Sequence, residues 1–278
     1  MRLRSLLFVP GDRPDRMEKA LGLGADALIL DLEDSVAAAR KAEAREAVAG
    51  FLRRTRRSIP LFVRINPVGG DLAEADLAAI ARARPDAIVQ PKAEGATSIR
   101  QLAARTDLPI LPIATETPAA LFGLSSYGEV HDQLIGLTWG AEDLPAAIGA
   151  TAAREADGRY TAPIETVRSL ALFAAHAAGV PAIETVYPDF RDLDGLAAYA
   201  ARGARDGFSG MMAIHPDQVA VINRAFTPDA EAIAAARAIV EAFAANPDAG
   251  VLAVEGRMVD APHLTQARRL LERAGEVA

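Results

Sequence analysis

The sequence predicts an α/β protein, a (β/α)₈ TIM barrel followed by a C-terminal helical extension. Short apolar runs alternate with longer Ala-rich amphipathic stretches, which is the pattern of parallel strands joined by helices. About eight such runs are present, the number that a closed barrel requires. Only 5% of the residues are aromatic, so Ala, Leu, Ile and Val must build the core. Helices packed on strands suit this composition better than an all-β sandwich.

The expected strands are apolar runs bounded by Gly, Pro or Asp. In chain order they are Ser5–Pro10, Ala27–Asp31, Leu61–Asn66, Ala87–Pro91, Ile110–Ala114, Leu134–Thr138, Ala182–Val186 and Met211–His215. The stretches between them are read as helices, among them Arg13–Leu23, Val36–Arg54, Leu72–Arg84, Thr97–Arg105 and Leu193–Arg205. Each is long enough for the right-handed crossover that joins parallel strands.

Two segments exceed a minimal barrel. The chain spends more than 40 residues between the sixth and seventh strands, with an irregular piece at Ala156–Tyr160 and a helix at Pro163–Ala178. After the eighth strand we expect helices at Pro216–Ala225, Pro228–Ala245 and His263–Ala274, and an extended piece at Gly250–Met258. We therefore expect a barrel domain over residues 1–226 and an extension over residues 227–278 that packs on a neighbouring subunit. Because no internal repeat or linker is visible, a doubly wound two-domain fold is the second choice.

Composition and charge exclude several classes of function. The 278 residues include no cysteine, which rules out disulfides, thiolate nucleophiles and Cys-containing zinc sites and fits a reducing cytoplasm. The formal net charge of −7 argues against a nucleic-acid surface, since phosphate binding needs a clustered positive field. No stretch approaches the roughly 20 apolar residues of a membrane span. We expect a cytoplasmic protein with neither a nucleic-acid nor a membrane partner.

Polar residues gather where the expected strands end, and this is where TIM barrels place their active sites. Every expected strand end carries a charged or hydrogen-bonding group, whereas the strand interiors are largely apolar. The strand-end segments are Pro10–Arg13, Asp31–Asp34, Arg64–Asn66, Gln90–Lys92, Thr115–Glu116, Trp139–Asp143, Glu184–Tyr187 and His215–Pro216. A purely structural barrel would not need this bias.

Glu116 and Asp143 form the best candidate metal pair among these residues. Mg²⁺ prefers oxygen ligands and commonly takes one or two protein carboxylates, with water and substrate filling its other positions. The alternative is that both carboxylates cap helices, because Pro118 and Pro145 follow them closely as in the first turn of a helix. The spacing alone leaves both interpretations open.

Two basic residues also lie at strand ends. Arg64 lies in the apolar run Leu61–Ile65, where an uncompensated charge is costly. It faces either Asp31 or Glu33, or it binds an acid, and we favour the acid because a guanidinium binds carboxylates bidentately. Lys92 is an ion-pair partner for Asp31 or, less favoured, a Schiff-base lysine.

Other catalytic patterns are weak. His215 is the one histidine of four at a strand end, so a Ser–His–Asp triad has little support. The glycines at 22–24 and 69–70 match neither dinucleotide-binding nor P-loop spacing. Arg13, Arg16 and Lys19 follow helical spacing, as either an exposed face or a small anion site.

Six motifs together carry a resemblance to a known family. They are Ser5–Pro14 (SLLFVPGDRP), Leu28–Ser35 (LILDLEDS), Val63–Pro67 (VRINP), Glu116–Pro118 (ETP), Gly140–Leu144 (GAEDL) and Ile214–Pro216 (IHP). In this order, over nearly the whole chain, they resemble the citrate lyase β-subunit-like (CitE-like) proteins of the HpcH/HpaI aldolase superfamily, which are related to malyl-CoA and citramalyl-CoA lyases.

The resemblance implies a Mg²⁺-dependent carbon–carbon lyase. Such an enzyme cleaves or forms a 3-hydroxyacyl-CoA thioester, such as citramalyl-CoA, malyl-CoA or citryl-CoA, by a retro-Claisen route. It implies an acyl-CoA or oxo-acid as the bound partner and a homo-oligomer, a trimer or hexamer. The alternatives are an aldolase that acts on free oxo-acids without CoA, and a non-enzymatic subunit that binds an acyl-CoA or a dicarboxylate.

The resemblance also implies roles for individual residues. Glu116 and Asp143 match the metal ligands, with Glu116 also at the substrate, and Arg64 matches an arginine that contacts the substrate and takes part in catalysis. The residues that match or lie beside contacts to the CoA thioester are Phe8, Arg13, Lys19, Ile214 and His215. In the C-terminal motif Gly256–Pro262, Asp260 matches a catalytic acid/base that reaches a neighbouring subunit's site.

Three positions depart from the family pattern. Met211 stands where a lysine is expected, and we expect it to weaken a phosphate contact to CoA. Glu184 replaces an aspartate and Gln90 replaces an apolar residue. We expect these two changes to tune the shape of the substrate site.

Overall fold

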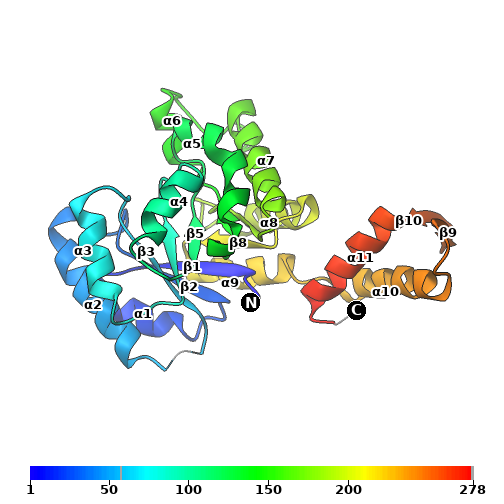
Figure 1. The fold of residues 1–278 in the computed structure, drawn as a ribbon, viewed down its shortest axis with the longest axis horizontal. Coiled ribbons are helices and arrows are strands. Elements are labelled where there is room, and N and C mark those ends of the chain that lie inside the picture. Colours follow the sequence, from blue (N-terminus) through cyan, green and yellow to red (C-terminus); the bar gives the residue numbers. More distant parts are fainter. Residues whose placement is uncertain (57, 277–278) are drawn as a thin grey trace. The chain divides into compact units, whose positions relative to one another are not determined.

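The computed structural model describes residues 1–56 and 58–276, and its eight parallel strands form the expected barrel (Figure 1). The strands are β1 (Ser5–Pro10), β2 (Ala27–Asp31), β3 (Leu61–Arg64), β4 (Ala87–Gln90), β5 (Ile110–Pro112), β6 (Leu137–Thr138), β7 (Ala182–Glu184) and β8 (Gly210–Ala213). They pair in the order β5-β4-β3-β2-β1-β8-β7-β6. Parallel bridges from Ile110 to Leu134 and from Ile113 to Thr138 close the barrel between β5 and β6. The predicted TIM barrel is confirmed.

Helices follow the strands, as the alternating sequence pattern predicts. They are α1 (Pro14–Ala20), η1 (Ala38–Arg40), α2 (Lys41–Arg54), α3 (Asp71–Ile80), α4 (Ala96–Ala103), α5 (Pro118–Gly123), η2 (Leu124–Gln133), α6 (Asp143–Ala147), α7 (Ala162–Ala177), α8 (Leu193–Asp206) and α9 (Pro216–Ala225). Local signals set several ends: Asp192 caps α8 by accepting from the Gly195 N–H, and Gly207 ends it at φ 116°, a left-handed conformation that glycine adopts without strain.

The pleat of each strand decides which side chains enter the barrel. The interior is a cluster of buried apolar side chains, which includes Phe62, Val89, Ile183 and Met212. Neighbouring residues of a strand point to opposite faces. The strand residues directly before and after each interior residue therefore face the helices. The carboxyl ends of the strands therefore carry both cavity-facing and helix-facing polar groups.

The chain divides into two compact units. One holds Met1 and residues 3–223, and the other holds Arg2 and the residues from Arg224 onward. The second unit contains α10 (Ala230–Ala245), β9 (Val251–Val254), β10 (Arg257–Asp260) and α11 (Ala261–Ala274). Its small core is formed by Ala236, Ala267 and Leu271.

We expected one extended piece at residues 250–258, and the structure corrects this to an antiparallel hairpin of β9 and β10. Its two-residue turn is Glu255 (φ 49°) and Gly256 (φ 76°), both left-handed, as a type I′ hairpin turn requires. Within residues 1–56 and 58–276, no helix combines the length and apolar character needed to cross a membrane.

Candidate functional site

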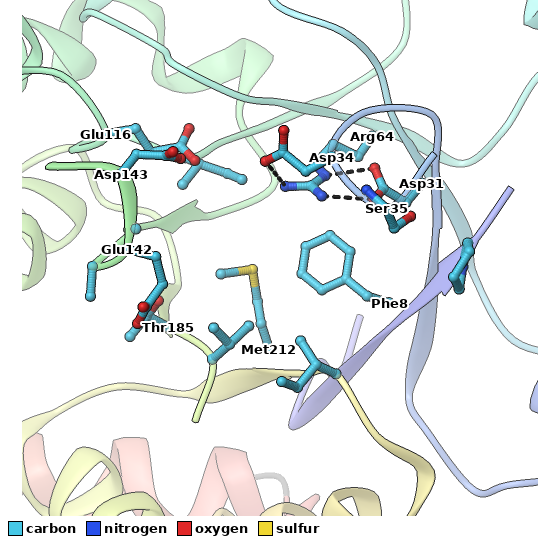
Figure 2. A pocket seen from close by; sticks show the side chains of 16 residues that line it. Phe8, Asp31, Asp34, Ser35, Arg64, Glu116, Glu142, Asp143, Thr185 and Met212 are labelled. Atoms are coloured by element: carbon cyan, nitrogen blue, oxygen red, sulfur yellow. Dashed lines mark hydrogen bonds and ion pairs between the residues drawn. The ribbon is translucent and has the colours of Figure 1, made fainter. Parts of the chain in front are cut away.

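A cavity of about 270 Å³ lies at the carboxyl ends of the barrel strands. Its lining includes five acidic side chains and one basic one, Arg64 (Figure 2). The acidic residues are Asp31, Asp34, Glu116, Glu142 and Asp143. The apolar part of the wall includes Phe8, Ile113, Val186, Met212 and Ile214.

Glu116 follows β5 and is almost completely buried, with 5% of its surface exposed. It does not cap α5, because Thr117 is the N-cap and accepts a hydrogen bond from the Ala120 N–H. Its Oε2 instead accepts from the main-chain N–H of Lys92 at 2.5 Å. Gly140 leaves room for it, since a Cβ there would lie 2.7 Å from the Glu116 Cγ. Helix capping is therefore excluded for this carboxylate.

Asp143 is the first residue of α6, and no side chain caps that helix. Its side chain, 44% exposed, lies beside Glu116 in the cavity (Figure 2). Burial chiefly, and then the nearby Glu33 and Asp143 carboxylates, raise the pKa of Glu116 to about 8, although the Lys92 N–H opposes this shift. Glu116 and Asp143 would repel each other when both are ionised, and a cation bound between them would stabilise the pair.

Arg64 ends β3 and faces the cavity beside the Phe8 ring, whose centroid lies 4.7 Å from its Cζ. Its Nε and Nη2 donate to the two oxygens of Asp31 at 2.7 Å each, and its Nη1 lies 3.1 Å from Glu33 Oε2. We favoured a bound acid as its partner, but the protein already supplies both carboxylates. The buried ion pair raises the pKa of Arg64 and lowers that of Asp31, even though burial alone would do the reverse.

Lys92 follows β4, and its partner differs from the expected Asp31. Its Nζ donates to Glu33 Oε1 at 3.0 Å and lies 3.9 Å from Asp143 Oδ2. Glu33 is thus held by Lys92 and Arg64 together, while burial raises its pKa. Sequence reasoning offered Glu33 as a possible partner of Arg64 but missed its hydrogen bond from Lys92.

Other residues expected at the site lie differently. Ile214 lines the cavity, but Arg13, Lys19 and His215 are not among the residues of its wall. Arg13 and Lys19 are exposed on or beside α1. The His215 ring stacks on Phe190, with 4.8 Å between centroids.

Asp260 belongs to the second unit, where it ends β10 and begins α11. It caps α11 in a reciprocal capping box with His263, whose Nδ1 lies 2.5 Å from Asp260 Oδ1. The hydrogen bond from His263 lowers the pKa of the Asp260 carboxyl.

The three departures from the family pattern all face the helices rather than the cavity. Met211 is fully buried beside the inward-facing Met212, and the expected weaker phosphate contact to CoA stays a prediction. Gln90 donates to the Ser98 carbonyl of α4, and Glu184 accepts from Trp139 and Arg168. These two side chains tie the barrel to its helical layer and do not shape the cavity.

Thr185, Ser35 and Glu142 line the cavity, and sequence reasoning assigned them no role. Thr185 illustrates the missing signal. It follows Glu184 by one residue, and the strand pleat turns Thr185 inward when Ile183 faces the interior.

Comparison with known proteins gives consistent results. Residues 4–216 match the HpcH/HpaI aldolase/citrate lyase family. The chain is 39% identical to a citrate lyase subunit beta-like protein of Mycobacterium tuberculosis, over 97% of this chain and 95% of that protein. It is 35% identical to a (3S)-malyl-CoA thioesterase of Cereibacter sphaeroides, over 99% of this chain and 95% of that protein. It is 33% identical to the mitochondrial citramalyl-CoA lyase of Rattus norvegicus, over 99% of this chain and 86% of that protein.

A solved structure shows the same similarity. The M. tuberculosis protein CitE in complex with magnesium, acetoacetate and coenzyme A superposes with a TM-score of 0.86. The two chains are 36% identical, and the match covers 99% of each.

Proposed function

Since the chain belongs to the HpcH/HpaI aldolase/citrate lyase family, we propose that it is a Mg²⁺-dependent carbon–carbon lyase of 3-hydroxyacyl-CoA thioesters. Citramalyl-CoA, malyl-CoA and citryl-CoA are the candidate substrates, cleaved or formed by a retro-Claisen route. The similar proteins include a (3S)-malyl-CoA thioesterase and a citramalyl-CoA lyase.

One observation carries the proposal: Glu116 and Asp143 meet in a cavity whose lining has five carboxyl groups and a single arginine. This wall would repel an oxo-acid carboxylate unless a cation lay between them. Arg64 cannot neutralise the whole wall, because its charge is already shared with Asp31 and Glu33.

The residues present fit a magnesium ion. Mg²⁺ is commonly held by one or two carboxylates, with water and substrate oxygens completing the octahedron, and the described residues contain no cluster of three or more His, Asp or Glu side chains that would hold a metal alone. Glu116 and Asp143 would be its protein ligands. When bound, the ion would polarise the carbonyl oxygen that emerges as the carbon–carbon bond breaks.

The remaining roles follow from position. Arg64 is fixed by Asp31 and by the Phe8 ring. Two of its five N–H groups donate to Asp31 and Nη1 also lies beside Glu33, so the remaining N–H groups can face the charge of a thioester enolate. As the carbon–carbon bond breaks, the substrate hydroxyl must give up its proton to form the carbonyl, and the enolate must gain a proton at its α-carbon. A carboxylate that takes up the first proton can return it to the enolate. We assign this transfer to Asp260 of a neighbouring subunit in a homotrimer or hexamer, with the C-terminal unit as the arm that carries it.

Arg13 and Lys19, both exposed, are assigned to the anionic CoA portion outside the cavity, and Phe8 and Ile214 to its acyl end. His215, stacked on Phe190, would border the same path. If the true substrate were a free oxo-acid aldol instead, replacing Arg13 and Lys19 by Ala would leave the turnover unchanged.

The test is to incubate the purified protein with a panel of 3-hydroxyacyl-CoA thioesters, with and without Mg²⁺, and to identify products by mass spectrometry. We expect an oxo-acid together with a shortened acyl-CoA, such as acetyl-CoA, only with Mg²⁺. Release of free CoA without carbon–carbon cleavage would instead identify a thioesterase. Binding without any turnover would identify a non-enzymatic subunit, and either outcome would refute the lyase.

A further inference from the structure

Lys92 contacts three carboxylates that come from different strand ends of the barrel. Its main-chain N–H donates to Glu116 at 2.5 Å, its Nζ donates to Glu33 at 3.0 Å, and the same Nζ lies 3.9 Å from Asp143. Glu116 and Asp143 are the proposed metal ligands. Lys92 is thus a single residue that touches both of them, once through its main chain and once through its side chain.

The backbone of Lys92 is unusual. Its φ is 50°, and within residues 1–56 and 58–276 the only other non-glycine residues with positive φ are Arg84 and Glu255. The left-handed region is unfavourable for residues with a Cβ. Glu255 occupies a hairpin turn that requires it, and Arg84 lies exposed after α3. Such strain persists only where the surrounding structure imposes it, and it gathers at functional sites.

The conformation of Lys92 has a direct consequence for Glu116. In this conformation the N–H of residue 92 donates to Glu116 Oε2. With one oxygen held in this way, the other remains for a cation, and the buried carboxylate cannot rotate freely. A hydrogen bond to a charged acceptor is among the stronger ones in proteins.

The ammonium group acts separately from the main chain. Together with Arg64 it neutralises Glu33, which is 3% exposed. Without Lys92, Glu33 would share a single guanidinium with Asp31. It also adds a positive charge near Asp143, which opposes the binding of a second cation there.

We propose that Lys92 is a positioning residue for the metal site: its left-handed main chain orients Glu116 toward the cation, and its ammonium moderates the affinity of the site. The inference rests on the proposed function, because it presupposes that Glu116 and Asp143 bind Mg²⁺. It makes Lys92 neither a Schiff-base lysine nor a catalytic residue.

Three variants that all lack the ammonium separate the role of the Lys92 main chain from the role of its side chain. Lys92→Gly and Lys92→Asn tolerate the left-handed conformation, whereas Lys92→Val, with a β-branched side chain, disfavours it. The measurement is the dissociation constant of Mg²⁺ alone by titration calorimetry on the full chain. Circular dichroism and thermal unfolding establish that each variant is folded.

We expect the Gly and Asn variants to bind Mg²⁺ at least as tightly as the wild type, and up to about tenfold more tightly. The Val variant should bind at least about tenfold more weakly than the Asn variant, because it loses the hydrogen bond to Glu116. Lys92→Ala should fall between them and serves if the Val variant does not fold. Arg84→Val is the matched control, because it places a valine at another left-handed position (φ 44°) that lies outside the cavity lining. The Mg²⁺ affinity of this variant should equal that of the wild type.

Equal Mg²⁺ affinities for the Val and Asn variants would overturn the main-chain role, and a Gly or Asn variant weaker than the wild type would overturn the moderating role of the ammonium. A wild-type protein that binds no Mg²⁺ would overturn the proposed function and this inference with it. The two kinds of failure are thus distinguishable.

Discussion

Replacing Gly140 by alanine should damage the metal site while leaving the fold intact. A Cβ at this position would lie 2.7 Å from the Glu116 Cγ and 3.3 Å from the Ile113 Cγ2. The first contact is about 0.7 Å shorter than the 3.4 Å at which ordinary van der Waals contact begins. The neighbouring side chain must move by a similar amount, and Glu116, 5% exposed, has little free space to enter.

Two effects of different size follow from Gly140→Ala. Overpacking a dense interior costs about 1–3 kcal/mol of folding free energy, which lowers the melting temperature by a few degrees per kcal/mol in a domain of this size. Mg²⁺ tolerates little departure from ideal octahedral geometry, so a displaced Glu116 should lower its affinity at least about tenfold, about 1.4 kcal/mol.

Titration calorimetry and thermal unfolding measure the two effects. Gly128→Ala is the control, because a Cβ there has no heavy atom closer than the Ala177 carbonyl oxygen at 4.0 Å. Its Mg²⁺ affinity and stability should match those of the wild type. If the Gly140→Ala protein bound Mg²⁺ as tightly as the wild type, Glu116 could not be a metal ligand that is packed against the main chain at Gly140.

Three further predictions concern pH, the buried ion pair and the C-terminal unit. Folded metal-free protein keeps a proton on Glu116 up to its pKa of about 8, whereas the unfolded chain releases it near 4.5, so stability should fall by up to about 5 kcal/mol as pH rises between these values. Urea unfolding should show this slope, and Glu116→Gln or added Mg²⁺ should flatten it; an unchanged slope in the Gln variant would contradict the assignment. Arg168→Leu leaves the fully buried Glu184 without its cation, and chemical denaturation should show a loss of about 3–5 kcal/mol, whereas a loss below about 1 kcal/mol would contradict the role of the pair. Asp260→Asn keeps a good N-cap and Asp260→Ala does not, so hydrogen exchange at the start of α11 should quicken in the Ala variant alone, while lyase turnover should fall in both; full turnover in the Asn variant would remove Asp260 from the chemistry.

The barrel could be predicted because its signals are local. Every expected strand overlaps an observed one, since each is a buried, largely apolar run. The hairpin of β9 and β10 was missed because its residues alternate only weakly and its turn, Glu255–Gly256, lacks the Asn or Asp that commonly announces it.

The sequence predicts several residues that line the site, but it does not predict which of them form ion pairs with one another. Glu116, Asp143 and Arg64 do line one cavity, because parallel strands bring their carboxyl ends together. Lys92 was expected beside Asp31 but bonds to Glu33, since two carboxylates only two residues apart cannot be ranked by spacing. Gln90 and Glu184 were placed in the site because an end-of-strand position does not reveal which face a side chain takes.

The dependence of turnover on Mg²⁺, compared between the wild type and Asp143→Asn, tests the central claim most directly. With the hydroxyacyl-CoA substrate that the panel identifies, the wild-type rate should rise to saturation with Mg²⁺ and vanish when a chelator is added. The Asn variant removes one ligand charge at a half-exposed position, so it should fold normally and require at least about tenfold more Mg²⁺ or turn over about a hundredfold more slowly. Turnover that is independent of Mg²⁺, or an Asn variant that matches the wild type at every Mg²⁺ concentration, would contradict the account.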